Sequence, residues 1–257
     1  MSKGRVARWD DGVWDDIRKS GKRVEGISIA PSGSVHFVGD VYFETARQKL
    51  TRHRIDFATD SLMAVHALSD TDVYISGYGP KVAHFDGAGI EILDSGMAND
   101  ESSYIGAICG RANDIYAGGE CGVAHYDGET WRQLATPDYA CLNAATTLAD
   151  GRVAFAGVSG DGALLLVGDA DSGFEVIELG DIAIDEELQG VAITERGDFL
   201  VTTGHTLLRA VGGEVEIELE CEKADLYAVA SNRAGEVVAA TAAGLFWLED
   251  GEWIPGD

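Results

Sequence analysis

The chain has 257 residues and a formal net charge of −25, because 44 Asp and Glu residues stand against 19 Lys and Arg. Its apolar content of 46% is enough to build a packed core, which excludes a wholly disordered chain. The 33 glycines predict many tight turns. No apolar run approaches the roughly 20 residues that span a membrane, and the first residues lack the apolar segment of a secretory signal. We therefore expect a cytoplasmic protein without a membrane segment.

The first predicted element is a hairpin at residues 5–17, in which alternating apolar residues lead to an aromatic residue, Asp and Gly. The motif returns at 82–87 and 123–131, and in weaker form at 207–213 and 245–253. A strand with alternating apolar residues, a glycine turn and a second strand are typical of a β-hairpin. The chain therefore repeats one hairpin along most of its length.

A second motif, a run of small and β-branched residues, precedes most of these hairpins. Its copies lie at 35–39, 73–77, 115–119, 153–157, 200–204 and 237–241, and all but the last end in glycine. Each copy follows a turn and an earlier short strand, such as 26–29 or 227–230. We therefore expect four short strands in each unit of about 40 residues, and no helical periodicity.

Units of this kind resemble bacterial β-propeller repeats of the WD-repeat-like or Asp-box-like type. The best copy, Tyr126–Trp131, departs from an Asp-box because its Asp is one residue closer to the Trp and the Ser is missing. The resemblance implies an all-β fold, a single β-propeller domain over residues 1–257. It implies no specific activity, because this fold hosts many functions.

The blade count follows from the inner strands. Six pairs of inner strands start near residues 24, 62, 104, 141, 188 and 226, which favours six four-stranded blades, with seven as the alternative. The hairpin at 5–17 is then surplus, and we expect it to complete or extend the last blade and to close the ring. Residues 41–57 match the outer-strand pattern poorly.

The charge is unevenly distributed. Residues 1–54 carry 11 Lys and Arg against 7 Asp and Glu, whereas the remainder carries 8 against 37. Many of the acids lie in the connections between units and in the loops within them, and in propellers these emerge on one face. The expected partner-binding residues on that face are Tyr78, Glu120, Asp138, Tyr139, Asp161, Asp185, Glu186, Glu187 and His205. Adaptation to salt is an alternative explanation of the acidity that the sequence leaves open.

Candidate chemistry is sparse. His84 and His125 occupy equivalent repeat positions, which indicates a structural role. No nucleophile elbow, phosphate-binding loop or H-E-x-x-H motif occurs, and the four cysteines have no zinc-ligand spacing. We therefore expect no metal, no cofactor and no catalytic residue. Carboxylates near His66, Asn143 or His205 in a central channel keep one alternative open, a Ca²⁺-dependent hydrolase or lyase.

These patterns favour a binding function. We expect a protein that is not an enzyme, whose acidic loop face engages a basic protein partner, in the manner of a cytosolic inhibitor or immunity protein that neutralises a toxin domain. We also expect a monomer that contacts neither nucleic acid nor membrane, since phosphate binding needs a basic surface.

Overall fold

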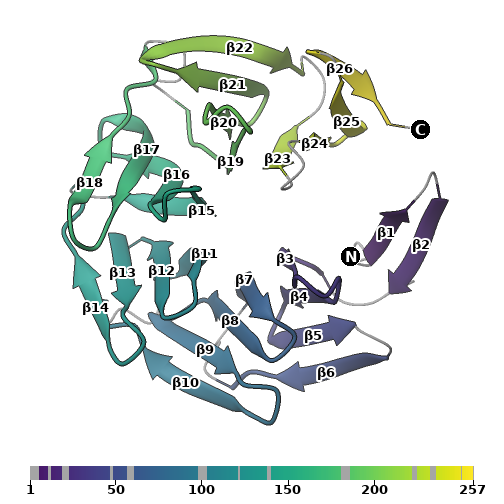
Figure 1. The fold of residues 1–257 in the computed structure, drawn as a ribbon, viewed down its shortest axis with the longest axis vertical. Coiled ribbons are helices and arrows are strands. Elements are labelled where there is room, and N and C mark those ends of the chain that lie inside the picture. The colour runs from purple at the N-terminus through teal and green to yellow at the C-terminus, as the bar shows by residue number, and fades with distance from the viewer. Residues whose placement is uncertain are drawn as a thin grey trace. The chain divides into compact units, whose positions relative to one another are not determined.

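The structure is a computed structural model, and it describes most of the chain. The described residues are 6–10, 13–18, 23–46, 49–56, 61–97, 103–120, 122–137, 140–180, 186–221, 225–231, 236–249 and 251–256. They divide into two compact units, residues 1–108 (unit 1) and 109–257 (unit 2). The regular elements among the described residues are β-strands (Figure 1). No helix in these ranges is long and apolar enough to cross a membrane.

Unit 1 contains one two-stranded and two four-stranded sheets. The two-stranded sheet is β1 (Val6–Asp10) and β2 (Val13–Arg18). The first four-stranded sheet is β3 (Gly26–Ile29), β4 (Val35–Gly39), β5 (Tyr42–Ala46) and β6 (Leu50–Arg54). The second is β7 (Leu62–Ser69), β8 (Asp72–Gly77), β9 (Lys81–Phe85) and β10 (Ile90–Asp94).

Four further four-stranded sheets follow. The first, which begins at the end of unit 1, is β11 (Ile105–Arg111), β12 (Asp114–Gly119), β13 (Gly122–Tyr126) and β14 (Trp131–Leu134). The next is β15 (Cys141–Thr147), β16 (Val153–Ser159), β17 (Gly162–Asp169) and β18 (Gly173–Val176). Then come β19 (Gly190–Ile193), β20 (Phe199–Thr202), β21 (Thr206–Val211) and β22 (Glu214–Glu220). The last is β23 (Leu226–Ser231), β24 (Val237–Thr241), β25 (Gly244–Glu249) and β26 (Glu252–Pro255).

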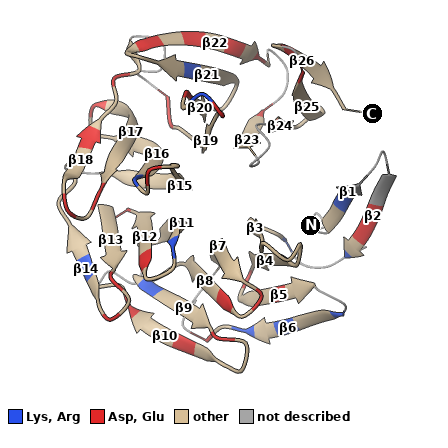
Figure 2. Cartoon of the chain, viewed as in Figure 1, with Lys and Arg blue, Asp and Glu red and all other residues tan. Residues whose placement is uncertain are grey.

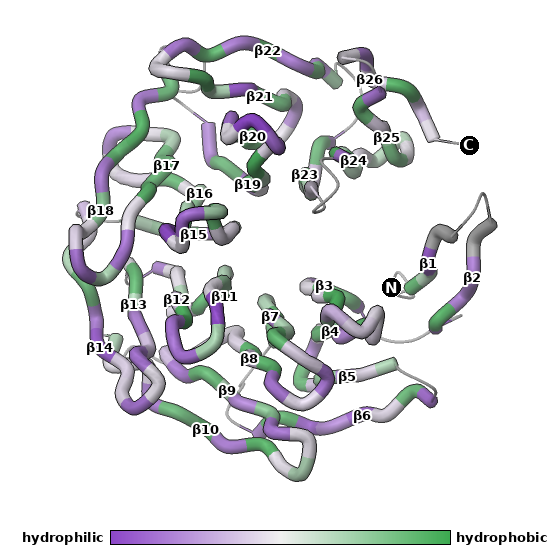
Figure 3. The backbone as a smooth tube through the Cα atoms, viewed as in Figure 1, coloured by the Kyte–Doolittle hydropathy of each residue, from purple (hydrophilic) through white to green (hydrophobic). Residues whose placement is uncertain are grey.

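Each sheet is a meander in which strands that follow one another in the chain lie side by side. The core lies between neighbouring sheets. In unit 1, Phe43 and Val38 of one sheet pack with Val65 and Ile75 of the next. In unit 2, one apolar cluster joins the sheets β15–β18 and β19–β22, and a second joins β19–β22 and β23–β26. Figure 3 shows hydrophobic positions in the strands, with hydrophilic positions in turns and along outer strands such as β14 and β22. Each sheet is therefore stabilised mainly by burial of its faces against its neighbours.

The recurrent Asp-Gly sequence forms the turn of the outer hairpins. The Asp86 Oδ1 atom accepts hydrogen bonds from the backbone N–H groups of Ala88 and Gly89, at 2.8 and 2.7 Å. Asp127 accepts the equivalent pair from Glu129 and Thr130. Hydrogen bonds to the carboxylate, from Gly89 and Ala88 in the first case, hold the pKa of both aspartates below the usual range. Gly87 has φ +88°, a conformation that a side chain would strain.

The equivalent histidines are part of the sheets. His84 Nε2 lies 2.8 Å from Asp72 Oδ1, and His125 Nε2 lies 2.7 Å from Asp114 Oδ1. Each imidazole also lies against a tyrosine of the adjacent strand, since the ring centroids of His125 and Tyr116 are 4.6 Å apart. The repeat thus places the same histidine–aspartate pair in two sheets.

The all-β expectation is confirmed, but the expectation of six blades is wrong. In the described ranges six sheets have four strands each and β1–β2 forms a separate two-stranded sheet, which agrees with the alternative of seven rather than with six. Within the described residues β1 pairs only with β2, and the expectation that the hairpin closes or extends the ring stays a prediction. In unit 1, Val6 of β1 packs with Val35 and Phe37 of β4. The poorly matching residues 41–57 supply ordinary outer strands, β5 and β6.

Candidate functional site

The loops within the sheets lie beside the connections between sheets in each unit. In unit 1, the Gly79 N–H group donates a hydrogen bond to the Ser103 carbonyl oxygen at 2.7 Å. In unit 2, Leu188 donates to Gly157 at 3.1 Å, and Leu226 donates to Gly204 at 2.9 Å. We call this side of each unit its loop edge. The shared edge that the sequence predicts for these two sets of loops is therefore present within each unit.

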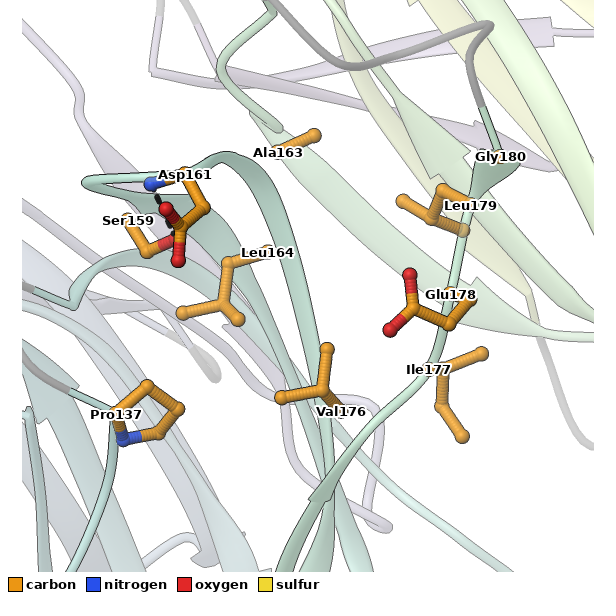
Figure 4. Close-up of a pocket in the computed structure, with 10 residues that line it drawn as sticks. All are labelled: Pro137, Ser159, Asp161, Ala163, Leu164, Val176, Ile177, Glu178, Leu179 and Gly180. Carbon is orange, nitrogen blue, oxygen red and sulfur yellow. Dashed lines mark hydrogen bonds between the residues drawn. The ribbon is translucent and has the colours of Figure 1, made fainter.

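A pocket of about 370 Å³ opens at the loop edge of unit 2 (Figure 4). Its lining comes from Pro137 after β14, from the turn between β16 and β17, and from the chain that follows β18. Asp161 and Glu178 are the charged residues of this lining. Figure 4 shows them on opposite sides, with Leu164 and Val176 between them. We call this cavity the acidic pocket.

A tight turn positions Asp161. The Asp161 N–H group donates a hydrogen bond to Ser159 Oγ at 3.3 Å, and the Ser159 hydroxyl donates to the Gly162 carbonyl oxygen at 3.4 Å. Gly162 has φ +110°, which favours glycine at this position. The turn uses the backbone of Asp161, and its exposed carboxylate forms no ion pair within the part of the chain that the structure describes.

Alternation along an extended segment positions Glu178. The Ile177 N–H group donates a hydrogen bond to the Leu165 carbonyl oxygen at 2.8 Å, and the Leu179 side chain is buried in the neighbouring apolar cluster. Successive side chains of an extended chain point to opposite sides. Glu178 is consequently exposed between two anchored neighbours, and Figure 4 shows its carboxylate directed across the pocket.

Glu186 and Glu187 lie on the connection that leads into β19. Asn143 of β15 donates hydrogen bonds from Nδ2 to Glu187 Oε1 at 2.7 Å and to the Leu188 carbonyl oxygen at 3.1 Å. Because Leu188 also binds Gly157, this connection lies beside the end of β16, from which the Asp161 turn starts. The structure therefore brings Asp161 and the Glu186–Glu187 segment to neighbouring parts of one loop edge.

The other predicted residues lie apart from the acidic pocket. His205 is exposed in the loop after β20, with its Nδ1 atom 3.9 Å from Asp225 Oδ1. Glu120 is exposed after β12. Tyr78 belongs to unit 1, where it forms an isolated bridge with Tyr104 at a ring-centroid distance of 5.9 Å. Tyr78 is half-buried there, and its role in partner binding stays a prediction. The predicted residues Asp138, Tyr139 and Asp185 lie outside the described residues.

The acidic pocket combines two carboxylates with apolar side chains. Carboxylates bind ammonium and guanidinium groups through charge-assisted hydrogen bonds, while Leu164 and Val176 can contact the aliphatic stem of such a side chain. Across the described residues, no group of three or more His, Cys, Asp or Glu side chains is arranged to hold a metal ion. The chemistry that the pocket offers is recognition of an organic cation.

Glu178 is the pocket residue that the sequence analysis missed. It was absent from the expected set because it follows an outer strand, Gly173–Val176, rather than lying within a predicted loop. The alternation Ile177, Glu178, Leu179 was the available signal, since it predicts an acid that faces away from two apolar neighbours.

No protein-family model and no curated protein sequence matches the chain. Among solved structures, virginiamycin B lyase from Staphylococcus aureus is similar, with a TM-score of 0.75 and 14% identity over 91% of this chain and 84% of the lyase. A catalytically inactive form of that lyase with quinupristin has the same TM-score and identity, over 99% and 88% of the two chains. The WD40 β-propeller domain of Doa1 has a TM-score of 0.73 at 10% identity, over 95% and 84%.

These comparisons correct one expectation. The sequence analysis expected a protein that is not an enzyme, and this is contradicted by the lyases among the similar structures. At 14% identity, however, the likeness to the Staphylococcus aureus lyase shows the fold alone.

The resemblance to propeller repeats is confirmed. The repeated sheets of four strands and the similarity to both a lyase and a WD40 domain agree with the repeats read from the sequence. The chain is a β-propeller repeat protein.

Proposed function

We propose that this protein binds a basic protein partner through the loop edge of unit 2, and that a lysine or arginine side chain of the partner occupies the acidic pocket. The observation that carries the proposal is that Asp161 and Glu178 face each other across a cavity whose described lining includes no Lys or Arg. A partner side chain that enters this pocket gains two carboxylate contacts and apolar contact for its stem.

The charge distribution supports the same partner chemistry. Residues 55–257 carry 37 Asp and Glu against 8 Lys and Arg, and Figure 2 shows acidic positions along the turns and outer strands of unit 2. A surplus of this size attracts a basic protein over a distance of about one Debye length, roughly 10 Å at 0.1 M salt. Association is then expected to be fast at low salt and slower at high salt.

The proposal extends to the setting of the interaction. We propose a cytoplasmic monomer that inhibits a basic toxin domain, as an immunity protein does, without contacting nucleic acid or membrane itself. Charge complementarity supports this reading, because domains that attack nucleic acids need a basic surface. The alternative of a Ca²⁺-dependent hydrolase or lyase has no supporting metal-ligand cluster among the described residues.

Hydrogen exchange with a lysine-rich peptide as the probe tests the location of the site. We expect protection to rise in residues 159–164 and 176–180 at low salt and to fade at about 0.5 M salt, where screening is strong. A neutral peptide of the same length is the control, and it is expected to cause no protection. Protection spread evenly over all acidic loops, or concentrated in residues 214–220 on β22, would contradict the proposed site.

A further inference from the structure

One face of the sheet β3–β6 is only half covered by the hairpin β1–β2. Ile27 pairs across strands with Phe37, and Ile29 pairs with Val35, so the four side chains share a face. Val6 of β1 packs against Phe37 and Val35, which are 1% and 5% exposed. Ile27 and Ile29 remain 53% and 65% exposed. The hairpin therefore covers β4 and leaves the apolar face of β3 open.

The opposite face of β3 is occupied. Ser28, between the two isoleucines, accepts a hydrogen bond at Oγ from the Ala67 N–H group of β7 at 3.0 Å. That face of β3 consequently packs against the next sheet. The exposed apolar pair is confined to the side on which the hairpin lies.

In the next sheet of unit 1, β7–β10, the residues equivalent to Ile27 and Ile29 are covered. Val65 and Ala67 of β7 pair with Ile75 and Val73, and both are 8% exposed. They occupy in β7 the place of Ile27 and Ile29 in β3. Their cover comes from the preceding four-stranded sheet, whose second strand contributes Val38 to the shared cluster.

Unit 2 repeats this arrangement. Val191 of β19 is 6% exposed and packs with Ala154 and Ala156, which belong to β16, the second strand of the preceding sheet. Inner strands are thus covered by the inner strands of the sheet before them. The sheet before β3 has none, because β1 pairs with β2 and with no other strand in the described ranges.

We propose that a β-hairpin of a partner protein docks beside β3, pairs with the open edge of β1 and covers Ile27 and Ile29. The space to fill is that of two strands, roughly 10 Å across. An open edge strand presents backbone N–H and C=O groups that an added strand can bind. The occupant is a hairpin of two short strands with small and β-branched residues, because inner strands of that composition fill the equivalent place in the other sheets.

This docking site is independent of the acidic pocket. It lies in unit 1, its contacts are apolar and backbone contacts, and the pocket lies in unit 2. Substitution of Asp161 and Glu178 is therefore expected to leave it unchanged, so failure of one proposal can be told from failure of the other.

The test uses the full chain and a synthetic peptide that copies residues 62–77, the inner strands β7 and β8, with fluorescence anisotropy as the readout. We expect the peptide to bind and a scrambled peptide not to bind. The double variant Ile27→Ser and Ile29→Ser should weaken binding by about tenfold or more, because the free energy gained by burying the two isoleucine side chains is lost. The matched control Ile92→Ser and Ile217→Ser removes isoleucines that are 42% and 54% exposed on β10 and β22, and it should bind like the wild type.

Hydrogen exchange supplies the second readout, with protection expected at residues 6–10 when the peptide is bound. The proposal is overturned if the peptide does not bind, if both double variants weaken binding equally, or if protection arises away from β1. It is also overturned if light scattering shows a dimer that the Ile27→Ser and Ile29→Ser variant dissociates, because a second copy would then cover this face.

Discussion

Glu44 lies in the interior of the first four-stranded sheet with a guanidinium group on either side. Arg18, at the end of the hairpin, donates a hydrogen bond to Oε2, and Arg52 donates from Nη2 and Nε to Oε1 at 2.7 and 2.9 Å. The side chains of Arg18 and Glu44 are 4% and 5% exposed. The Arg18 guanidinium also lies 4.9 Å from the centroid of the Phe37 ring. The Arg18–Glu44 pair joins the hairpin to β5 almost wholly out of contact with water, whereas the Arg52 side chain is 45% exposed.

Replacement of Glu44 by Gln is expected to destabilise the protein by about 3 kcal/mol. The substitution removes the negative charge that lies between two guanidinium groups, and removal of one partner from a buried ion pair is strongly destabilising. Urea unfolding measures the difference. Glu91→Gln, on the exposed strand β10, is the control and should change stability by less than about 0.5 kcal/mol. Equal stabilities of the two variants would contradict the structural role of the cluster.

Because His36 is buried, we expect the free energy of unfolding to decrease in mild acid. It is fully buried, its ring is stacked on Phe43 at a centroid distance of 5.9 Å, and neither ring nitrogen has a hydrogen-bond partner in the described structure. Burial lowers its pKa from 6.5, and the negative charge of Asp70 opposes this shift only in part. Below pH 6.5 the His36 imidazole is therefore protonated in the unfolded chain but stays neutral in the folded one. The free energy of unfolding is consequently unaffected by His36 above pH 6.5 and decreases as the pH falls below it.

The variant His36→Phe isolates this effect. Its melting temperature should fall less steeply than that of the wild type between pH 6.5 and 5, because the titrating group is gone while the aromatic stack on Phe43 is kept. If the melting temperatures of the wild type and the variant fell equally between pH 6.5 and 5, His36 would not have a pKa below its ordinary value.

At the scale of the strand, glycine decides how closely inner strands approach. A Cβ atom at Gly157, the residue of β16 opposite Leu142, would lie 1.9 Å from the Cys141 carbonyl oxygen. The register shifts between Leu142 and Ala144, which brings the β15 backbone toward the glycine. Gly39 and Gly77 meet the same obstacle from Arg23 and Ser61. This close approach explains the glycine at Gly39, Gly77 and Gly157, whereas a Cβ atom at Gly204 would meet nothing within 4 Å.

Gly157→Ala is expected to lower the stability by about 2 kcal/mol, the usual cost of forcing a methyl group into packed backbone. Gly160→Ala is a matched control in the following turn, where nothing lies within 4 Å of the added Cβ. Thermal unfolding of both variants measures the difference. If the two alanines cost the same, the close approach at Gly157 is not what requires glycine.

The strands themselves were largely predictable, and the pocket was not. Alternating residues and Asp-Gly turns mark β9, β13 and β25 directly in the sequence. The role of Glu178 depends on the anchoring of Ile177 and Leu179 by a neighbouring strand and sheet, which no local pattern contains. Tyr78 resembled a loop aromatic, but its contact with Tyr104 follows from a long-range pairing between two connections.

For the whole molecule, the number of sheets was the hardest feature to predict. The hairpin at the start has the sequence of an outer strand pair, and composition alone does not say against which sheet it packs. Contacts between Val6 and Phe37, far apart in sequence, decide the question and give seven sheets. The repeat period predicted the propeller fold. Which sheet the hairpin β1–β2 packs against could be learned only from the structure.

The net charge predicts that salt stabilises the folded protein. A formal charge of −25 on 257 residues creates mutual repulsion in the compact state, and salt screens it. We expect the melting temperature to rise by a few degrees between about 10 mM and 500 mM KCl, with differential scanning calorimetry as the measurement. A melting temperature that falls over this range would show that favourable ion pairs outweigh the repulsion.

Two charge-matched double variants, compared by calorimetric titration with the lysine-rich peptide, test most directly whether Asp161 and Glu178 form a cation-binding pocket. Asp161→Asn with Glu178→Gln removes both carboxylates of the pocket. Asp171→Asn with Glu214→Gln removes two exposed carboxylates elsewhere in unit 2, one in a turn and one at the start of β22. We expect the pocket variant to bind at least about tenfold more weakly than the wild type, since each charged contact contributes about 1 kcal/mol or more, and the control to bind within about twofold. Equal weakening by both variants would show that the peptide responds to net charge alone, and the acidic pocket would then not be the binding site.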